Sequence, residues 1–363
     1  MPAQPPASNP EERIAAACLV LNAAGVTMRR FAEAGVSPAD LPESAARLAL
    51  NPHESALVTE LTRLRFGERE REKALSQGWS VVDVTSPSYP QLLRQIADPP
   101  LALYVRGDPA WLSRPAIAIV GSRNATLYGR SAAEALASQL ALRGLVITSG
   151  FARGIDAAAH RAAVRAGGGT VAVLGCGLTI DYPRGHESLR DMISQHGCLV
   201  SEFPLETGPR KENFPRRNRI IAGLSLGVVV VEAHEISGAL ITARHAAEQG
   251  REVFAVPGNV FAPSSRGPHR LIKDGAKLTE SAEDVLAEIA AVFTPQPLAS
   301  GGTTPETGTV EASVYSALTP EPVHADELAR KLGLPMASLM SVLPVLELKR
   351  CARQHPGKRF SLA

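Results

Sequence analysis

The sequence predicts an α/β protein whose core is a Rossmann-like, doubly wound and mostly parallel sheet. From residue 116 to residue 286, short apolar runs rich in β-branched residues alternate with segments of helical periodicity. That alternation is typical of parallel strands that are buried on both faces and joined by crossover helices. A helical module precedes this region, and a linker with a winged helix follows it. We therefore expect three domains in the 363 residues.

Residues 1–75 are rich in Ala and Leu and predict a small helical module of the SAM or helix-hairpin-helix type. Apolar residues recur at helical spacing at Ile14, Cys18, Leu21, Leu57, Leu61 and Leu64. Gly25 and Gly35, each followed by Val, favour C-caps of short helices. Tight turns that grip a DNA backbone remain the alternative for these two glycines.

Residues 76–292 are expected to form the Rossmann-like, DNA-binding core. Its strands are predicted at residues 116–120, 145–148, 170–174, 199–201, 228–232 and 253–256. Its helices are predicted at residues 128–143, 155–166, 187–196 and 238–249. Each helix has the length and periodicity of a crossover between parallel strands, which is the basis for expecting a doubly wound sheet.

Residues 293–309 have the composition of a linker, because Pro, Gly and Thr replace bulky apolar residues. Residues 310–363 predict a winged helix. Its helices are expected at residues 314–318, 326–332 and 336–348, and its hairpin is expected to turn at Pro356-Gly357. The third helix is mostly apolar, and Pro344 is expected to kink it. Packing or protein contact is therefore favoured over the reading of DNA by this helix.

The composition is that of a soluble globular protein, and the formal net charge is only +2, so an anionic partner must meet a local patch. The four cysteines are far apart and form no C-x-x-C pair. This pattern argues against a structural zinc site and a disulfide framework, and it fits a reducing, cytoplasmic setting. The apolar stretch 14–21 is too short to span a membrane and follows no cationic region, so we expect neither export nor a membrane anchor.

The segment 209–222 carries five cations, one acid and one aromatic residue. Its cations Lys211, Arg216, Arg217 and Arg219 suit the neutralisation of phosphates. Phe214, in their midst, offers a face on which an unpaired base can stack. A solvated charged loop is the alternative. The segment leads into the buried strand expected at 228–232, where ligands of α/β sheets bind, and this position favours a nucleic-acid site.

Two glycine-rich turns follow the first two strands of the core, at residues 121–124 and 149–156. Glycines at such turns let backbone N–H groups approach an anion, and Arg123 and Arg153 add bidentate donors. The segment 237–242 opens a helix after a later strand and can supply further N–H donors. The alternative is that these are ordinary βα turns whose arginines pair with a nearby carboxylate.

Enzyme signatures are absent from the core. No dinucleotide fingerprint and no Walker A loop is present. Residues 223–227 match G-x-S-x-G, but a nucleophile elbow needs the strand before the Ser, and here the strand follows it. The histidines lack the spacing of a metal site. We therefore expect no catalytic constellation, no metal and no cofactor.

Several motifs in the core together resemble the DprA family. They lie at residues 119–123, 149–156, 175–177, 182–183, 214–225, 231–233, 237–243, 250–258 and 271–276. The motifs follow the family order across the core, whereas the flanking regions match the family only in layout. One departure is visible at residues 267–270, where the family usually has Asn and this chain has Gly-Pro-His-Arg. Arg270 is expected to add phosphate affinity there.

The resemblance implies a mediator of DNA recombination, not an enzyme, that serves natural transformation in competent cells. Such a protein binds incoming single-stranded DNA, loads the RecA recombinase onto it and works as a homodimer, with single-strand-binding protein as a further candidate partner. Its strand-binding pocket would fall on Arg123, Lys211 and Phe214. The full set of expected DNA-binding residues is Gly121, Ser122, Arg123, Ser149, Gly150, Arg153, Gly154, Lys211, Asn213, Phe214, Arg217, Asn218, Arg219, Ser237 and Gly238.

Two other classes of function compete with this interpretation. The core also resembles, in topology, the nucleotide-hydrolysing enzymes of the lysine-decarboxylase-like group. Their Pro-Gly-Gly-x-Gly-Thr loop is missing, because Pro257-Gly258 is followed here by Asn259-Val260. The third possibility is an interaction module that works through the winged helix alone.

Overall fold

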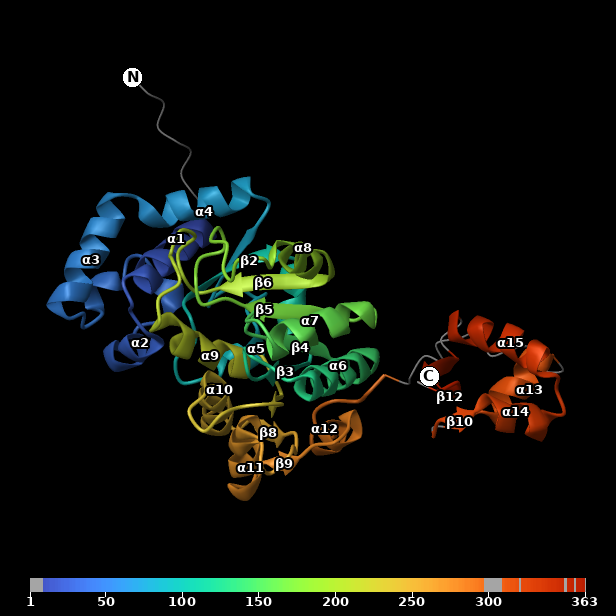
Figure 1. The fold of residues 1–363 in the computed structure, drawn as a ribbon. Coiled ribbons are helices and arrows are strands. Elements are labelled where there is room, and N and C mark those ends of the chain that lie inside the picture. The colour runs from blue at the N-terminus through green and yellow to red at the C-terminus, as the bar shows by residue number, and fades with distance from the viewer. Residues whose placement is uncertain (1–8, 297–308, 320, 349–350, 356, 363) are drawn as a thin grey trace. The chain divides into compact units, whose positions relative to one another are not determined.

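The computed structural model describes residues 9–296, 309–319, 321–348, 351–355 and 357–362. The chain forms two compact units, residues 1–295 and 296–363 (Figure 1). The predicted linker lies mostly at 297–308, outside the described residues. The helical module and the sheet belong to the same unit, so the boundary expected at residue 75 remains a prediction.

A nine-stranded sheet is the centre of the first unit. Its strands are β1 (Ser80–Asp83), β2 (Ala102–Gly107), β3 (Ala116–Val120), β4 (Val146–Ser149), β5 (Thr170–Val173), β6 (Gly197–Ser201), β7 (Gly227–Val230), β8 (Glu252–Ala255) and β9 (Lys277–Leu278). Their order is β1-β2-β6-β5-β4-β3-β7-β8-β9, and all neighbours from β6 to β9 pair in parallel. The predicted Rossmann-like, mostly parallel sheet is therefore confirmed.

Strands β1 and β2 were not expected from the sequence. They run antiparallel to each other, and β2 runs antiparallel to β6. Strand β1 offers only two consecutive apolar residues, Val81 and Val82, which is too short a run to show a strand period. The antiparallel pair extends the sheet beyond β6 and provides the surface on which the helical module packs.

Helices cover both faces of the sheet, and alternate residues of each strand point to opposite faces. Ile117 and Ile119 of β3 pack with α6 (Leu127–Leu142), α7 (Ile155–Arg165) and α12 (Ala282–Glu288). Ala118 and Val120 belong to the core on the opposite face. The helices that contribute to that opposite core include α1 (Pro10–Ala23), α8 (Glu187–His196), α9 (Asn213–Gly223) and α10 (Gly238–Glu248). Helices α5 (Gln91–Arg94) and α11 (Arg266–Lys273) complete the layers.

The N-terminal module consists of α1 together with α2 (Met28–Ala34), α3 (Pro52–Arg63) and α4 (Phe66–Ser76). Cys18, Leu19 and Leu21 of α1 belong to the same buried cluster as the strands. The buried Asn22 amide donates a 2.6 Å hydrogen bond to the carbonyl of Glu202, just after β6. Gly35 is the left-handed C-cap of α2, with φ of 61°, which confirms the cap interpretation for this glycine. None of the helices in the described ranges is, by itself, long and apolar enough to span a membrane, although the bent pair α1–α2 meets that criterion by length and composition.

The second unit is a winged helix, as predicted. It contains α13 (Val310–Ala317), α14 (Ala325–Leu332), α15 (Met336–Leu348) and a sheet of β10 (Val323–His324), β11 (Ala352–His355) and β12 (Arg359–Leu362) in the order β10-β12-β11. Leu339, Leu343 and Leu346 of α15 are buried in the core of this unit, so the apolar character of the helix serves packing. Pro344 lies inside α15 and does not end it.

Gly67 marks a close contact between α4 and α1. A Cβ atom at this position would lie 2.1 Å from the carbonyl oxygen of Ala16. Without that contact, Ala would stabilise the helix by about 0.5–1 kcal/mol relative to Gly. We instead expect Gly67→Ala to lower the free energy of unfolding by about 1–3 kcal/mol, as overpacked core variants do, when measured by urea denaturation.

Gly208→Ala is the matched control, because a Cβ atom at Gly208 would meet nothing within 4 Å. Equal stability of the two variants would show that α1 and α4 do not approach as closely as the structure has them.

Candidate nucleic-acid interface

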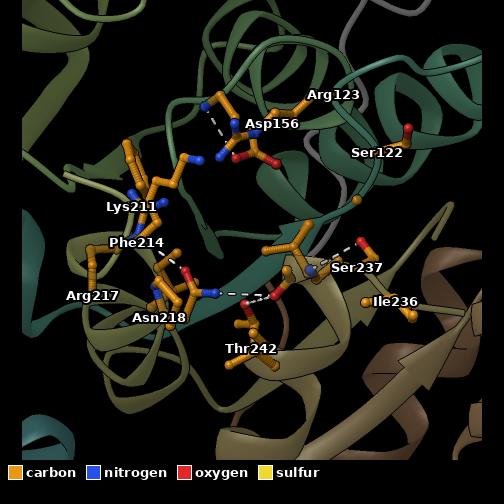
Figure 2. A pocket seen from close by; sticks show the side chains of 18 of the residues that line it. Ser122, Arg123, Asp156, Lys211, Phe214, Arg217, Asn218, Ile236, Ser237 and Thr242 are labelled. Atoms are coloured by element: carbon orange, nitrogen blue, oxygen red, sulfur yellow. Dashed lines mark hydrogen bonds between the residues drawn. The ribbon is translucent and has the colours of Figure 1, made fainter. Parts of the chain in front are cut away.

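A pocket of about 680 Å³ opens at the carboxyl ends of β3 and β7 (Figure 2). From β3 the chain builds the sheet toward β6, and it then returns to add β7 on the other side of β3. Open α/β sheets bind ligands at such a switch point. Gly121 and Ser122 line the pocket directly after β3, and Ser237 and Gly238 line it at the start of α10. The sequence motifs of these two turns are therefore brought together.

Phe214, near the start of α9, lies at the wall of this pocket. Its ring is only partly buried, and the Arg123 guanidinium carbon lies 5.3 Å from the ring centroid. Tyr182 lies 5.6 Å away from Phe214, centroid to centroid, with the rings tilted by 46°. A Cβ atom at Gly175 would lie 2.7 Å from Cδ1 of Phe214, so the absence of a side chain there gives the ring its place.

The exposed cations of the pocket have no acidic partner. Among the ion pairs of the described residues, none includes Arg123 or Lys211. Arg123 and Lys211 line the pocket together with Phe214, and both of their side chains are exposed. An uncompensated charge beside a partly exposed aromatic ring is the arrangement that suits a nucleotide.

Arg217 also lines the pocket, but its guanidinium group is buried in the wall. Nη1 donates to the carbonyl oxygens of Gly150, at 2.8 Å, and of Val173. Nε donates to the Asn218 side chain at 3.2 Å. Burial lowers the pKa of Arg217 to about 10, which leaves it charged at neutral pH. Arg217 thus fastens the carboxyl ends of β4 and β5 to α9.

Asp156 is the buried carboxylate that faces this arginine. It accepts a 3.2 Å hydrogen bond from the amide of Ala152. Burial raises the pKa of its carboxyl group, and the positive charge of Arg217 acts in the opposite direction. A Cβ atom at Gly150 would lie 2.8 Å from both the Arg217 guanidinium and the Asp156 carboxylate. Only glycine leaves room for the two side chains at this point.

Arg219 does not lie at the pocket, contrary to the expectation that it neutralises phosphate. Its side chain is 9% exposed and pairs with Glu202 at 2.6 Å and with Asp98 at 3.2 Å. Arg216 pairs with the same Glu202 at 3.0 Å. The electrostatic attraction of these acids raises the pKa of Arg219 despite its burial. Arg270, which was expected to add phosphate affinity, pairs with Asp274 at 3.6 Å.

The remaining expected residues support the pocket in different ways. The buried Ser149 hydroxyl donates to the carbonyl of Ile119 at 2.6 Å and joins β4 to β3. Gly154 has φ of 77°, and a Cβ atom there would lie 2.2 Å from the carbonyl oxygen of Ser122, so it lets the two turns touch. Asn218 donates to the carbonyl of Gly238 at 3.1 Å.

The expected residues that line the pocket are Gly121, Ser122, Arg123, Lys211, Phe214, Arg217, Asn218, Ser237 and Gly238. Those that do not are Ser149, Gly150, Arg153, Gly154, Asn213 and Arg219. The lining residues that sequence reasoning did not include in the site are Val120, Ala152, Asp156, Tyr182, Pro209, Pro215, Ile221, His234, Ile236, Ala239, Ile241 and Thr242. The motif at 182–183 could have identified Tyr182 as a site residue, because it follows the third predicted strand of the core.

The fold and the pocket define a Rossmann-like protein with a pocket lined by cationic side chains at the switch point of its sheet. The comparisons with known proteins specify it further. The family model of DNA recombination-mediator protein A matches residues 80–290, and that of the DprA winged helix matches residues 295–358. The chain therefore belongs to the DprA family, and the resemblance noted in its core motifs is confirmed.

Individual relatives agree with this assignment. The chain is 48% identical over 214 residues to DNA processing protein DprA of Bacillus subtilis, covering 59% of this chain and 72% of that protein. It is 39% identical over 341 residues to protein Smf of Escherichia coli, covering 88% and 90% of the two chains. The X-ray structure of DprA from Streptococcus pneumoniae matches with a TM-score of 0.67 and 36% identity, covering 78% of this chain and 98% of that one.

A second solved structure is DNA processing protein A from Helicobacter pylori, described for its single-stranded DNA binding mode. It matches with a TM-score of 0.54 and 29% identity, covering 60% of this chain and 97% of that one.

The buried position of Arg219 leads to a stability prediction. Removing Arg219 leaves the Glu202 carboxylate, which is 1% exposed, with only the partly exposed Arg216 as a partner. We expect Arg219→Ala to lower the free energy of unfolding by about 3–5 kcal/mol, as is usual when one partner of a buried ion pair is removed, in urea denaturation experiments.

Arg210→Ala removes the same charge from an exposed side chain of the same segment and should change stability by less than about 0.5 kcal/mol. An equally small loss of stability in Arg219→Ala would show that Arg219 is not held in a buried ion pair, and Arg219 would again be a candidate phosphate ligand.

Proposed function

We propose that this protein binds single-stranded DNA in the pocket between β3 and β7. The observation that carries the proposal is the partly exposed Phe214 ring flanked by Arg123 and Lys211, two exposed cations without acidic partners. A base stacks on the ring, and the cations neutralise the adjacent phosphates. The single-stranded DNA binding mode described for the H. pylori relative supports this assignment.

Stacking on Phe214 favours a single strand over a duplex. The faces of bases in a duplex are covered by their neighbours, whereas every unpaired base has a free face. The glycine turn at 121–122 and the N-terminal turn of α10 add backbone N–H groups that suit phosphate oxygens. Arg217 and Asn218 support the site indirectly, because their hydrogen bonds hold the loops that carry these groups.

The pocket suits binding more than catalysis. Among the described residues that line it, Asp156 is the one carboxylate, and it is buried and engaged by the Ala152 amide. A buried, occupied carboxylate is poorly placed to activate water for nucleotide hydrolysis. This supports a mediator in preference to the nucleotide-hydrolysing alternative.

The bound strand is then passed to the RecA recombinase during natural transformation, and the protein acts as a cytoplasmic homodimer, with single-strand-binding protein as a further partner. The recombination-mediator description of the family supports this role.

The DNA-binding proposal is tested by titrating fluorescent oligo-dT and a duplex of the same length at several salt concentrations. Phe214→Ala is expected to weaken oligo-dT binding by about 1–3 kcal/mol, the value of one stacked base, with the salt dependence unchanged. Lys211→Ala is expected to weaken binding and to reduce the slope of log K against log[salt] by about 0.7, the contribution of one neutralised phosphate.

Arg47→Ala is the control for the charge removed, because Arg47 is exposed in the helical module and does not line the pocket. It also takes part in no ion pair of the described residues. Undiminished binding in Lys211→Ala and Phe214→Ala would place the DNA site elsewhere. Failure of the unaltered protein to bind oligo-dT would favour the hydrolase alternative.

The mediator role is tested by RecA filament assembly on DNA coated with single-strand-binding protein. The unaltered protein should shorten the lag before assembly, and Phe214→Ala should lengthen the lag again because it holds the strand less tightly. An equal lag with and without the protein would contradict the mediator role but not the DNA binding.

A further inference from the structure

A second hollow, of about 460 Å³, adjoins the first at the carboxyl ends of β4 and β5. It is lined by residues 150–153, 174–176 and 182–184. The residues that line both hollows are Arg123, Ala152, Tyr182, Phe214 and Arg217, and the pair formed by the Arg123 guanidinium and the Phe214 ring belongs to this common border. Any extended ligand that occupies the first pocket can pass over this border into the second.

The second hollow is surrounded by unpaired positive charge. Arg123, Arg153 and Arg184 line it, all three side chains are exposed, and none takes part in an ion pair within the described ranges. Arg153 donates only a 3.4 Å hydrogen bond, to the carbonyl of Arg184. The pairing of Arg216 and Arg219 with Glu202 shows that this fold neutralises arginines that serve packing. The unpaired three repel one another, and a polyanion relieves that repulsion.

Tyr182, which lines both hollows, gives the second hollow an aromatic face in addition to Phe214. The side chain is partly buried, and its hydroxyl makes no hydrogen bond within the described part of the chain. A base held between two rings needs about 6.8 Å, twice the 3.4 Å rise of a stacked base. The 5.6 Å between the Tyr182 and Phe214 centroids is too short for this, so each ring can offer only its outer face to a separate base.

The loop between the two hollows is held rigidly. Phe151 is buried with φ of 60°, a backbone conformation that is unfavourable for a bulky residue and that clusters at functional sites. Its ring packs edge-on against His186 at 5.3 Å and lies beneath the Arg190 guanidinium at 5.6 Å. Arg217 holds the neighbouring Gly150 carbonyl. The floor of the second hollow is therefore formed before any ligand arrives.

We propose that the second hollow is a second nucleotide subsite for the same single strand. The inference rests on the proposed function, since the strand enters it from the Phe214 pocket. One nucleotide stacks on Phe214, the strand crosses the Arg123–Phe214 border, and the next base meets Tyr182. Arg184 and Arg153 neutralise the phosphates beyond it.

The first test measures oligo-dT affinity at several salt concentrations. Arg184→Ala is expected to weaken binding and to reduce the slope of log K against log[salt] by about 0.7, because one phosphate contact is lost. Tyr182→Ala is expected to weaken binding about tenfold with an unchanged slope, within the range for one stacked base, whereas Tyr182→Phe keeps the ring and should bind as the unaltered protein does. Arg47→Ala again controls for the removed charge.

The second test places a single iododeoxyuridine at successive positions of the oligonucleotide and maps photo-crosslinks by mass spectrometry. Adducts on Phe214 and Tyr182 are expected from neighbouring positions of the strand. Because Tyr182 contacts Phe214, its removal could also disturb the first pocket. The salt slope of Arg184→Ala is free of this ambiguity, since Arg184 is exposed and lines only the second hollow.

The outcomes separate this inference from the proposed function. If the unaltered protein binds oligo-dT and Lys211→Ala weakens it, but Arg184→Ala has full affinity and slope and no adduct forms on Tyr182, the second subsite is overturned and the first stands. If the unaltered protein binds no oligo-dT, both fall together.

Discussion

The buried guanidinium of Arg217 is the group on which the rest of the pocket depends. It links the carbonyls at the ends of β4 and β5 to a side chain of α9, and it balances the buried charge of Asp156. Each of these elements carries part of the binding surface: the turn after β4, the turn after β5, and the aromatic ring of α9. One charged side chain, removed from solvent, thus fixes the relative positions of two turns and a helix that are distant in the sequence.

The arginines of a single basic segment have separate tasks. Arg217 organises backbone carbonyls, Arg219 and Arg216 neutralise Glu202, and Lys211 is left for solvent and ligand. This division could not be predicted from the sequence, because the two partners of Arg219 are distant in the chain. They are Glu202, which follows β6, and Asp98, which precedes β2. Composition located the segment, but the tertiary partners decide which charges remain available to a ligand.

The core of the fold could be predicted because the six inner strands are buried runs of β-branched residues followed by periodic helices. The edge strand β1 could not, because only two of its four residues are apolar. Strand β2 was missed although its residues 102–105 form a buried apolar run. The pocket was foreseen at Arg123, Lys211 and Phe214, where residue type and place after a strand both point to an anion. Tyr182 was missed as a site residue because its contact with Phe214 is tertiary.

The hydrogen bond from Asn22 to the carbonyl of Glu202 has a consequence for how the molecule opens. The Glu202 carbonyl accepts a hydrogen bond from Asn22 of α1, and the Glu202 carboxylate accepts one from Arg219 of α9. The helical module and the helix that bears Phe214 therefore share one anchoring residue. Local unfolding of the module would remove the Asn22 hydrogen bond from Glu202, whose carboxylate pairs with Arg216 and Arg219 of α9. A substitution in the N-terminal helices that disturbs Glu202 would then reach the helix that carries Phe214 without touching the pocket.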